Sequence, residues 1–368
     1  MSNSGGIASR FDRWIFESYL VGPYALALCR IFFSSYILFF VFRPINWVGT
    51  YPSIFYVPPP SLARLFPTFP PEWFFHGLNI LAVFFLLGVL FGYRTRGSSI
   101  GIFIVLFTYN TFAHSFGKID HSILFVLFPL VMSFSNWGAA WSIDQARGKS
   151  KAQVQGWPIT LMAVLLGFAM FTSGLYKLES GWLDLSTQAT QSKVCSNVYA
   201  WQRGDLLAPF AAKFYAPRGW ELLDWFTVIM EIGFLPAVFF PKIFRWFVGS
   251  AVFFHLGVLL LLNIDFSVNL FVYLPFVHWG KVSRYLGKGK ARVIDSGNRF
   301  LKRMHPLFLL PIAGIFILVL YTYGCIWKML LTWAGVEQPY LAGLLYLGGA
   351  SLVTILLFFK KYRAVPTH

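Results

Sequence analysis

A lysine stands where a long apolar stretch of the chain gives way to polar and aromatic residues. The apolar stretch covers residues 157–175, and it is followed by Tyr176, Lys177, Glu179 and Trp182. A lysine at the mouth of a membrane helix can extend its ammonium to the membrane surface, which is an anchoring role. It can also transfer protons, because desolvation at the edge of a low-dielectric cavity favours the neutral amine. These residues alone leave both roles open.

Three ionisable residues, Lys118, Asp120 and His121, lie in a short break between two apolar segments. If this break and Lys177 share one face of a membrane, then Lys177, His121 and Asp120 come within reach of one another. Such a cluster between apolar walls is the pattern expected of a proton-transfer site. The structural alternative is that Asp120 caps a helix beginning near His121 while Lys118 anchors at the interface. Spacing alone slightly favours the structural alternative.

Three further polar residues, Arg30, Glu231 and His255, fall inside apolar segments, where an ionisable group is energetically costly. A structural pair inside the bundle, for instance Arg30 with Glu231, explains them as well as a functional role does. His255 is most simply an interior histidine with a hydrogen bond. The three cysteines form no CxxC pair and the histidines show no HExxH spacing, so we expect no metal site.

The composition of the chain is that of a membrane protein. Its 368 residues are 57% apolar and 20% aromatic but only 12% charged, and their mean hydropathy is +0.63. Soluble domains carry about 25% charged residues. Ten apolar segments alternate with polar ones, and they cover 24–42, 75–92, 98–113, 122–135, 157–176, 222–240, 246–262, 266–279, 306–325 and 339–359. We therefore predict an all-α integral membrane protein, a polytopic helical bundle of about 8–10 transmembrane helices.

Basic residues are distributed unevenly between the loops on the two sides of the predicted membrane. One set of loops, which includes both termini and 280–305, carries 20 Lys and Arg residues, whereas the alternate set, which includes 177–221, carries 9. The positive-inside rule places the richer set, and hence both termini, in the cytoplasm. Lys177 and the 118–121 cluster then lie on the external face. The net charge of +16 occurs in short clusters, which favours contact with anionic membrane lipids over nucleic-acid binding.

Several short pieces of sequence occur in the order typical of one membrane-protein family. They are Leu28-Cys29-Arg30-Ile31-Phe32-Phe33, Phe91-Gly92-Tyr93-Arg94, Lys118-Ile119-Asp120-His121-Ser122-Ile123-Leu124, Trp141-Ser142-Ile143-Asp144, Ser173-Gly174-Leu175-Tyr176-Lys177-Leu178-Glu179-Ser180-Gly181-Trp182, Glu231 within its apolar run, and Phe254-His255. Over residues 20–280 the chain resembles the HTTM (horizontally transferred transmembrane) domain, which is common in bacteria. This domain is similar to the membrane domain of the vitamin K-dependent gamma-carboxylases.

The resemblance implies roles for individual residues. Lys177 falls on the family's catalytic lysine and His121 on the histidine that assists it, with supporting positions at Asp120, Lys118, Tyr176, Glu179 and Trp182. In the carboxylases the lysine deprotonates reduced vitamin K, whose reaction with O2 creates a base that takes a proton from a glutamate side chain, to which CO2 adds. The implied co-substrates are reduced vitamin K or a related quinone, O2 and CO2. The implied location is a bacterial inner membrane with a periplasmic active face.

The predicted organisation is a membrane domain over 1–280, a basic cytoplasmic loop over 281–305, and two additional transmembrane helices with a tail over 306–368. No counterpart of the carboxylases' large lumenal domain is recognisable, which leaves open the acceptor, expected as a peptide or protein on the external face. The leading prediction is a membrane enzyme that couples epoxidation of a reduced quinone to proton abstraction and carboxylation of this acceptor. The alternatives are a non-catalytic HTTM-fold subunit, a maturation or immunity partner, and a small-molecule transporter that uses Glu231, Arg30 and His255.

Overall fold

The computed structural model of the protein describes residues 7–42, 44–116, 122–150, 153–277, 279, 309–324, 326–333 and 340–359. Within these ranges the regular elements are helices, and the one pairing of extended backbone is an isolated bridge between Val57 and Phe116. The predicted all-α fold is therefore confirmed for the part of the chain that the structure describes.

Four helices in the described ranges are long and apolar enough to cross a membrane. They are Pro23–Val41, in which α2 (Pro23–Tyr36) continues as a π-helical turn, α3 (Glu72–Phe91), α7 (Trp157–Glu179) and α11 (Pro241–Leu262). A span needs about 20 residues, because each residue of an α-helix advances the chain by about 1.5 Å. These helices indicate an integral membrane protein, whereas the predicted number of spans and the cytoplasmic position of the termini stay predictions.

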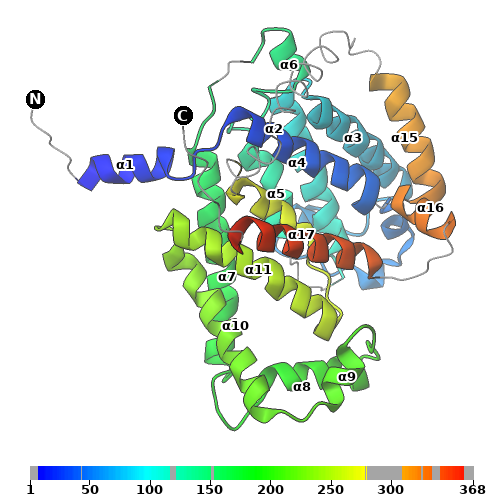
Figure 1. Cartoon of the computed structure of the whole chain (residues 1–368). Coiled ribbons are helices and arrows are strands. Elements are labelled where there is room, and N and C mark those ends of the chain that lie inside the picture. The colour runs from blue at the N-terminus through cyan, green and yellow to red at the C-terminus, as the bar shows by residue number, and fades with distance from the viewer. Residues whose placement is uncertain are drawn as a thin grey trace, which may run out of the picture. The chain divides into compact units, whose positions relative to one another are not determined.

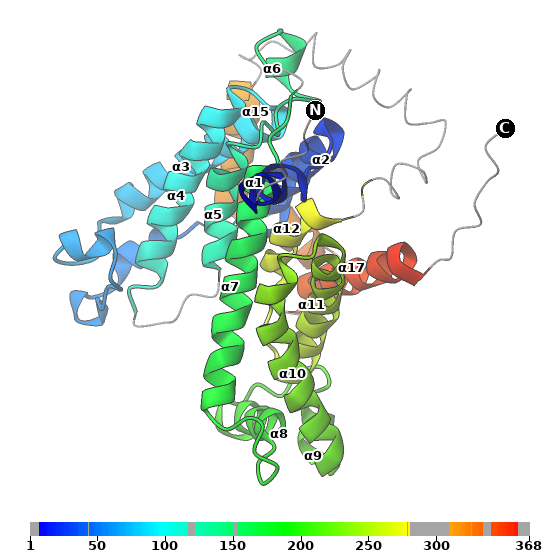
Figure 2. The same cartoon turned by 90° about the vertical axis from the view of Figure 1, so that its left-hand side faces the viewer.

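The chain folds as two compact units, of which the first comprises Met1–Met162 with Leu286–Glu337. Its helices include α1 (Ile7–Glu17), α2, α3, α4 (Thr95–Ala113), α5 (Ile123–Met132), α6 (Ile143–Ala146), α15 (Leu309–Tyr323) and α16 (Ile326–Trp333). Helix α3 packs against α2, α4 and α15, and α4 packs against α5 (Figure 1, Figure 2). The core of this unit is aromatic, since the buried rings of Phe33, Phe128 and Trp137 lie with centroids 5.2, 5.8 and 6.0 Å apart.

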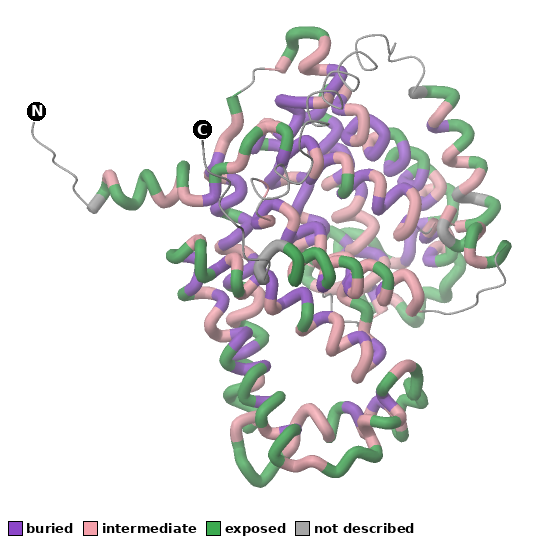
Figure 3. The backbone as a smooth tube through the Cα atoms, in the orientation of Figure 1, coloured by how far each residue is buried: buried purple, intermediate pink, exposed green. Residues whose placement is uncertain are grey.

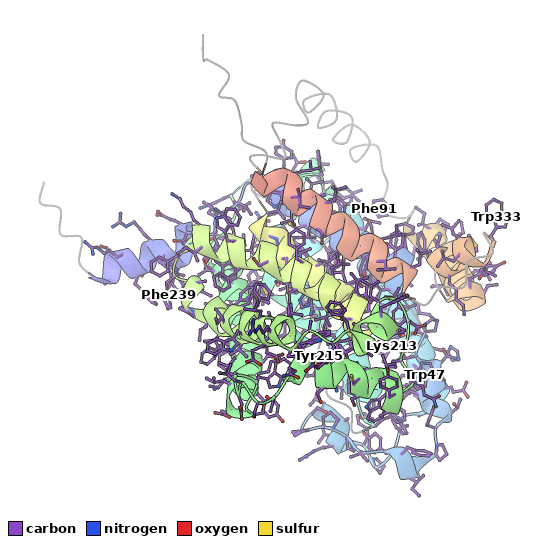
Figure 4. All side chains as sticks on the ribbon, turned by 60° about the horizontal axis from the view of Figure 1, so that its bottom comes forward. Trp47, Phe91, Lys213, Tyr215, Phe239 and Trp333 are labelled. Carbon is purple, nitrogen blue, oxygen red and sulfur yellow. The ribbon has the colours of Figure 1, made fainter. Side chains whose placement is uncertain are left out.

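Residues 44–74 of the first unit form a packed series of 3-10 turns, Asn46–Thr50, Ser53–Phe55 and Leu62–Leu65. The ring of Phe116 holds this series in place, because its centroid lies 5.9 Å from Trp47, 5.0 Å from Tyr51 and 4.9 Å from Phe69 (Trp47 is labelled in Figure 4). Aromatic pairs at such distances stabilise a surface segment beyond simple area burial. Phe116 thus fixes the point of the chain that directly precedes residues 117–121.

The second unit comprises Ala163–Tyr285 with Gln338–His368. It holds most of α7, then α8 (Ala189–Cys195), α9 (Ala208–Lys213), α10 (Pro217–Ala237), α11 and α17 (Leu341–Phe359). Helices α10 and α11 pack as an antiparallel hairpin, and α17 packs across α11 (Figure 1). The α8–α9 region at the end of this hairpin is mostly exposed or half-buried (Figure 3), and it includes Tyr215, which is 86% exposed (Figure 4).

The two predicted C-terminal segments, 306–325 and 339–359, belong to different units. Helix α15 packs on α3 of the first unit, and α17 packs on α11 of the second. The apolar segment 266–279 is a run of short helical turns, Ser267–Asn269, α12 (Leu270–Tyr273) and Leu274–Phe276. Pro275 contributes to this break, because proline lacks the N–H donor that a continuous helix needs. The basic loop 281–305 lies outside the described residues.

Candidate functional site

The centre of the candidate site is an ion pair between α7 and α10 of the second unit. The Nζ atom of Lys177 lies 2.7 Å from Oε1 and 2.6 Å from Oε2 of Glu231, and it also donates to the Ser173 hydroxyl at 3.0 Å. The Glu231 side chain is 5% exposed, whereas that of Lys177 is 18% exposed. The carboxylate is therefore enclosed, and the lysine is the member of the pair that an external molecule can reach.

Two glycines on one side of α7 allow this pairing. A Cβ atom on Gly174 would lie 2.8 Å from Cβ of Glu231 and 2.9 Å from the backbone nitrogen of Ile232. One on Gly167, two helical turns earlier, would lie 2.6 Å from a methyl carbon of Val238. Small residues at such positions let membrane helices approach closely. The close approach of α7 and α10 brings Lys177, one turn after Ser173, beside Glu231.

The end of α7 folds an aromatic ring back over the lysine. Gly181 adopts a left-handed conformation (φ +80°), and the backbone N–H of Trp182 donates to the carbonyl of Lys177 at 3.2 Å. This is the Schellman ending of a helix, in which glycine accepts a φ that costs other residues free energy. As a result the Lys177 Nζ lies 5.4 Å from the centroid of the Trp182 ring, within the range of a cation–π contact.

A short turn after Trp182 completes this loop. The Asp184 carboxylate accepts hydrogen bonds from the backbone N–H and the hydroxyl of Ser186, at 2.9 and 2.8 Å. These bonds hold the pKa of Asp184 below its usual value, because they stabilise the charged form. The exposed loop is thus ordered by its own side chains.

The pair can accept one proton in total. When the Lys177 ammonium passes a proton to Glu231, the pair becomes a neutral amine beside a protonated carboxyl. The amine then has a lone pair for an incoming acidic group, and the Trp182 ring offers an aromatic surface at the same place. A buried carboxylate in contact with an amine is a recognised arrangement for proton transfer.

The remaining predicted members of this site have different outcomes. Tyr176 is 73% exposed, and Glu179 is exposed at the end of α7, so both point away from the buried side of the pair. The structure brings the Trp182 ring to Lys177, and the supporting role of Trp182 stays a prediction. Lys118, Asp120 and His121 lie outside the described residues, and the proximity of His121 to Lys177 stays a prediction.

Arg30 is a structural residue of the first unit. Its guanidinium is fully buried and donates to the carbonyl oxygens of Val89, Leu90, Trp137 and Trp141, with Leu90 and Trp141 both at 2.6 Å. It therefore joins the end of α3 to the segment that precedes α6. The suggested pair between Arg30 and Glu231 is wrong, because Arg30 is occupied by carbonyl groups and Glu231 by Lys177.

The Arg30 junction explains two other pieces of the family pattern. Gly92 has a φ of +64°, and a Cβ there would lie 2.3 Å from Cβ of Ser142 and 3.1 Å from the Arg30 guanidinium. Asp144 accepts from the backbone N–H groups of Arg94 and Thr95, at 2.9 and 2.7 Å, and so caps the start of α4. The 91–94 and 141–144 pieces are therefore part of the scaffold of the first unit.

His255 is an interior histidine, as its position in the sequence suggested. Its Nε2 atom lies 2.7 Å from the Tyr273 hydroxyl, and its ring stacks on the ring of Tyr273 at 5.9 Å. Its Nδ1 atom is buried without a hydrogen-bond partner in the described part of the chain. The Tyr273 partner was missed by sequence reasoning, because only spatial contact links α11 with α12.

Asp224 is a second residue that sequence reasoning missed. It is fully buried on α10, and its carboxylate accepts from the backbone N–H groups of Ala189 and Thr190, at 2.9 and 2.8 Å, and from the Thr190 hydroxyl. It therefore caps α8 from another helix, just as Asp144 caps α4. A lone aspartate seven residues before Glu231 was the available signal, since acids are rare in this apolar run.

A family model described as HTTM domain matches residues 21–279. No curated protein and no solved structure matches the chain. The matched range contains every piece of sequence on which the resemblance rests, from Arg30 to His255.

Proposed function

We propose that this chain, which belongs to the HTTM domain family, is a gamma-carboxylase-like membrane enzyme in which Lys177 deprotonates a reduced quinone. The observation that carries the proposal is the Lys177–Glu231 pair. One member is accessible, the other is enclosed, and both carboxylate oxygens lie within 2.7 Å of the amine. An anchoring lysine needs no buried carboxylate, because its ammonium is solvated at the membrane surface.

The proposed step consists of two proton transfers. A proton moves from Lys177 Nζ to Glu231, and the neutral amine accepts the hydroxyl proton of the reduced quinone. The outcome is a protonated Glu231, a Lys177 ammonium and a deprotonated substrate beside that ammonium. The positive charge next to the substrate oxygen stabilises the product of the transfer. The proposal assigns to His121 the assisting role that the family resemblance implies.

The surroundings of Lys177 suit an aromatic, apolar substrate. Trp182 is half-buried, and its ring centroid lies 5.4 Å from the Lys177 Nζ. Binding sites for flat hydrophobic molecules combine such surfaces with a few polar groups. In the proposed reaction the reduced quinone and O2 give quinone epoxide and water, coupled to proton removal from an acceptor and addition of CO2.

The test is a mass-spectrometric assay of the full-length protein in detergent, supplied with reduced vitamin K and air. We expect quinone epoxide from the native protein and none from Lys177→Ala. Lys193→Ala, which removes an exposed lysine of α8, is the matched control and should keep native turnover. Because Lys177→Ala leaves Glu231 buried without its cation, the double variant Lys177→Ala/Glu231→Gln separates loss of chemistry from loss of fold.

Two results would refute the proposal. One is epoxide formation by a folded Lys177→Ala/Glu231→Gln variant at the native rate. The other is a folded native protein that binds reduced vitamin K but consumes none of it in air, which would favour a non-catalytic subunit with the HTTM fold. Labelled CO2 in the same assay, with proteins from the host membrane as acceptors, tests the carboxylation half of the proposal.

A further inference from the structure

A cavity of about 340 Å³ lies in the first unit, at the end of α4 that begins with Thr95. Its wall is formed by that helix start and by the segments on either side of α6, and it includes Arg96, Asn136, Lys149 and Ser150. This volume is at the lower end of the range for small-molecule sites, about 300–1,000 Å³. None of the residues discussed for the Lys177–Glu231 pair contributes to it.

The residues that line this cavity carry more positive than negative charge. Arg96 and Lys149 supply two cations, and Asp144 is the one acid among the described residues that line it. Both Asp144 oxygens already accept hydrogen bonds, Oδ1 from Arg94 and Oδ2 from Thr95. Its charge is therefore directed at the start of α4, and an anion in the cavity would meet the Arg96 and Lys149 cations.

The cavity is held open by fixed contacts. Asn136 adopts a left-handed conformation (φ +59°), its Nδ2 donates to the Gln153 carbonyl at 2.7 Å, and its Oδ1 accepts from the Ser150 hydroxyl at 3.1 Å. Asparagine tolerates this conformation better than most residues. The Arg96 guanidinium lies 4.8 Å from the centroid of the Phe134 ring, which restricts its position by a cation–π contact.

We propose that this cavity binds a phosphate group, supplied either by the headgroup of an anionic phospholipid or by a soluble phosphate monoester. Arg and Lys together with neutral donors are the groups that recognise phosphate oxygens. The loops that form the cavity, 93–97 and 136–156, belong to the set assigned to the cytoplasmic side by charge counting. Basic pockets at that level of membrane proteins bind anionic lipid headgroups.

The experiment compares lipid retention by native mass spectrometry of the full-length protein in detergent. The probes are phosphatidylglycerol, phosphatidylcholine and glycerol 3-phosphate. We expect the native protein to retain phosphatidylglycerol over phosphatidylcholine, and Arg96→Gln/Lys149→Gln to bind phosphatidylglycerol more weakly by on the order of 30-fold. Arg10→Gln/Arg13→Gln, which removes two exposed cations of α1, is the matched control and should bind as the native protein does.

The arms of this experiment identify the source of the phosphate group. Displacement of phosphatidylglycerol by glycerol 3-phosphate would show a site for the phosphate group itself, and no displacement would show a site for the lipid. The proposal is overturned if Arg96→Gln/Lys149→Gln retains phosphatidylglycerol as the native protein does. It is also overturned if the α1 control pair loses as much affinity, or if phosphatidylcholine is retained equally well.

Discussion

Glu231 holds Lys177 with both of its carboxylate oxygens, at 2.7 and 2.6 Å, although the two residues lie 54 positions apart in the sequence. The two members are unequal, because the carboxylate is 5% exposed and the lysine 18% exposed. A buried carboxylate next to an accessible amine is a directional arrangement. A proton that reaches Lys177 can pass to the Glu231 carboxylate, which is shielded from water.

Because the two side chains differ in exposure, replacing Lys177 and replacing Glu231 should destabilise the protein by different amounts. Lys177→Ala leaves a buried carboxylate without its cation and should lower the free energy of unfolding by about 3 kcal/mol. Glu231→Gln leaves a lysine that can still turn toward water, so its cost should be smaller, about 1 kcal/mol. Thermal unfolding in detergent, followed by tryptophan fluorescence, measures both. The double variant should be more stable than Lys177→Ala, and a strictly additive result would contradict the pairing.

The approach of α7 to α10 predicts a steric effect at Gly174. Gly174→Ala places a methyl group 2.8 Å from Cβ of Glu231 and 2.9 Å from the Ile232 nitrogen, so the helices must separate. We expect a loss of about 1–3 kcal/mol and a reduced quinol turnover in the assay described above. Gly257→Ala on α11 is the matched control, because nothing lies within 4 Å of a Cβ there. It should be neutral or slightly stabilising, and an equal loss in both variants would exclude the steric explanation.

The sequence was sufficient to find the polar residues but not to pair them. Arg30, Glu231 and His255 stand out because an ionisable group in an apolar segment is costly, and Lys177 stands out because it directly follows such a segment. The sequence suggested Arg30 as a partner of Glu231, and nothing in the spacing of the spans shows which helix lies beside α10. The glycines of α7 carried part of this information, since Gly167 and Gly174 lie seven residues apart and share one face of the helix.

The helical segments themselves were predictable, because apolar composition over 15 to 20 residues is a property of the local sequence. The caps of α4 and α8 were not, because Asp144 and Asp224 reach them from other parts of the chain. The broken helix 267–276 was also missed, since its apolar residues resemble those of a span. Tertiary contacts decide these features, and a single sequence does not record them.

The Arg30 junction predicts that lysine cannot replace arginine there. Arg30 distributes its planar guanidinium over carbonyl groups of two segments, and a lysine has neither the fork geometry nor enough donors. Arg30→Lys should therefore leave buried carbonyl groups unsatisfied, at a cost on the order of 3 kcal/mol. Arg147→Lys, at an exposed position, is the control and should leave the unfolding temperature unchanged. An unchanged unfolding temperature for Arg30→Lys would contradict the proposed junction.

The capping of α8 by Asp224 predicts a local effect. Asp224→Ala removes the acceptor for two backbone N–H groups and the Thr190 hydroxyl, and it should cost about 1–2 kcal/mol. In hydrogen exchange followed by mass spectrometry, Asp224→Ala should speed up exchange relative to the native protein in α8 more than in α11, because only α8 loses its cap. The exposed Asp205→Ala serves as the control. Equal exchange in α8 of the native and Asp224→Ala proteins would show that the cap does not stabilise this helix.

The contact between His255 and Tyr273 predicts that replacing both residues destabilises the protein less than replacing either one alone. Tyr273→Phe removes the partner of Nε2 and leaves a buried imidazole with neither nitrogen bonded, which should cost about 1–3 kcal/mol. His255→Phe removes the imidazole but leaves the Tyr273 hydroxyl buried, with a similar cost. The double variant His255→Phe/Tyr273→Phe leaves no unsatisfied polar atom from either residue and keeps two stacked rings. In thermal unfolding, the double variant should be more stable than either single variant. If the double variant also retains quinol turnover, the His255–Tyr273 pair stabilises α11 and takes no part in proton transfer at Lys177.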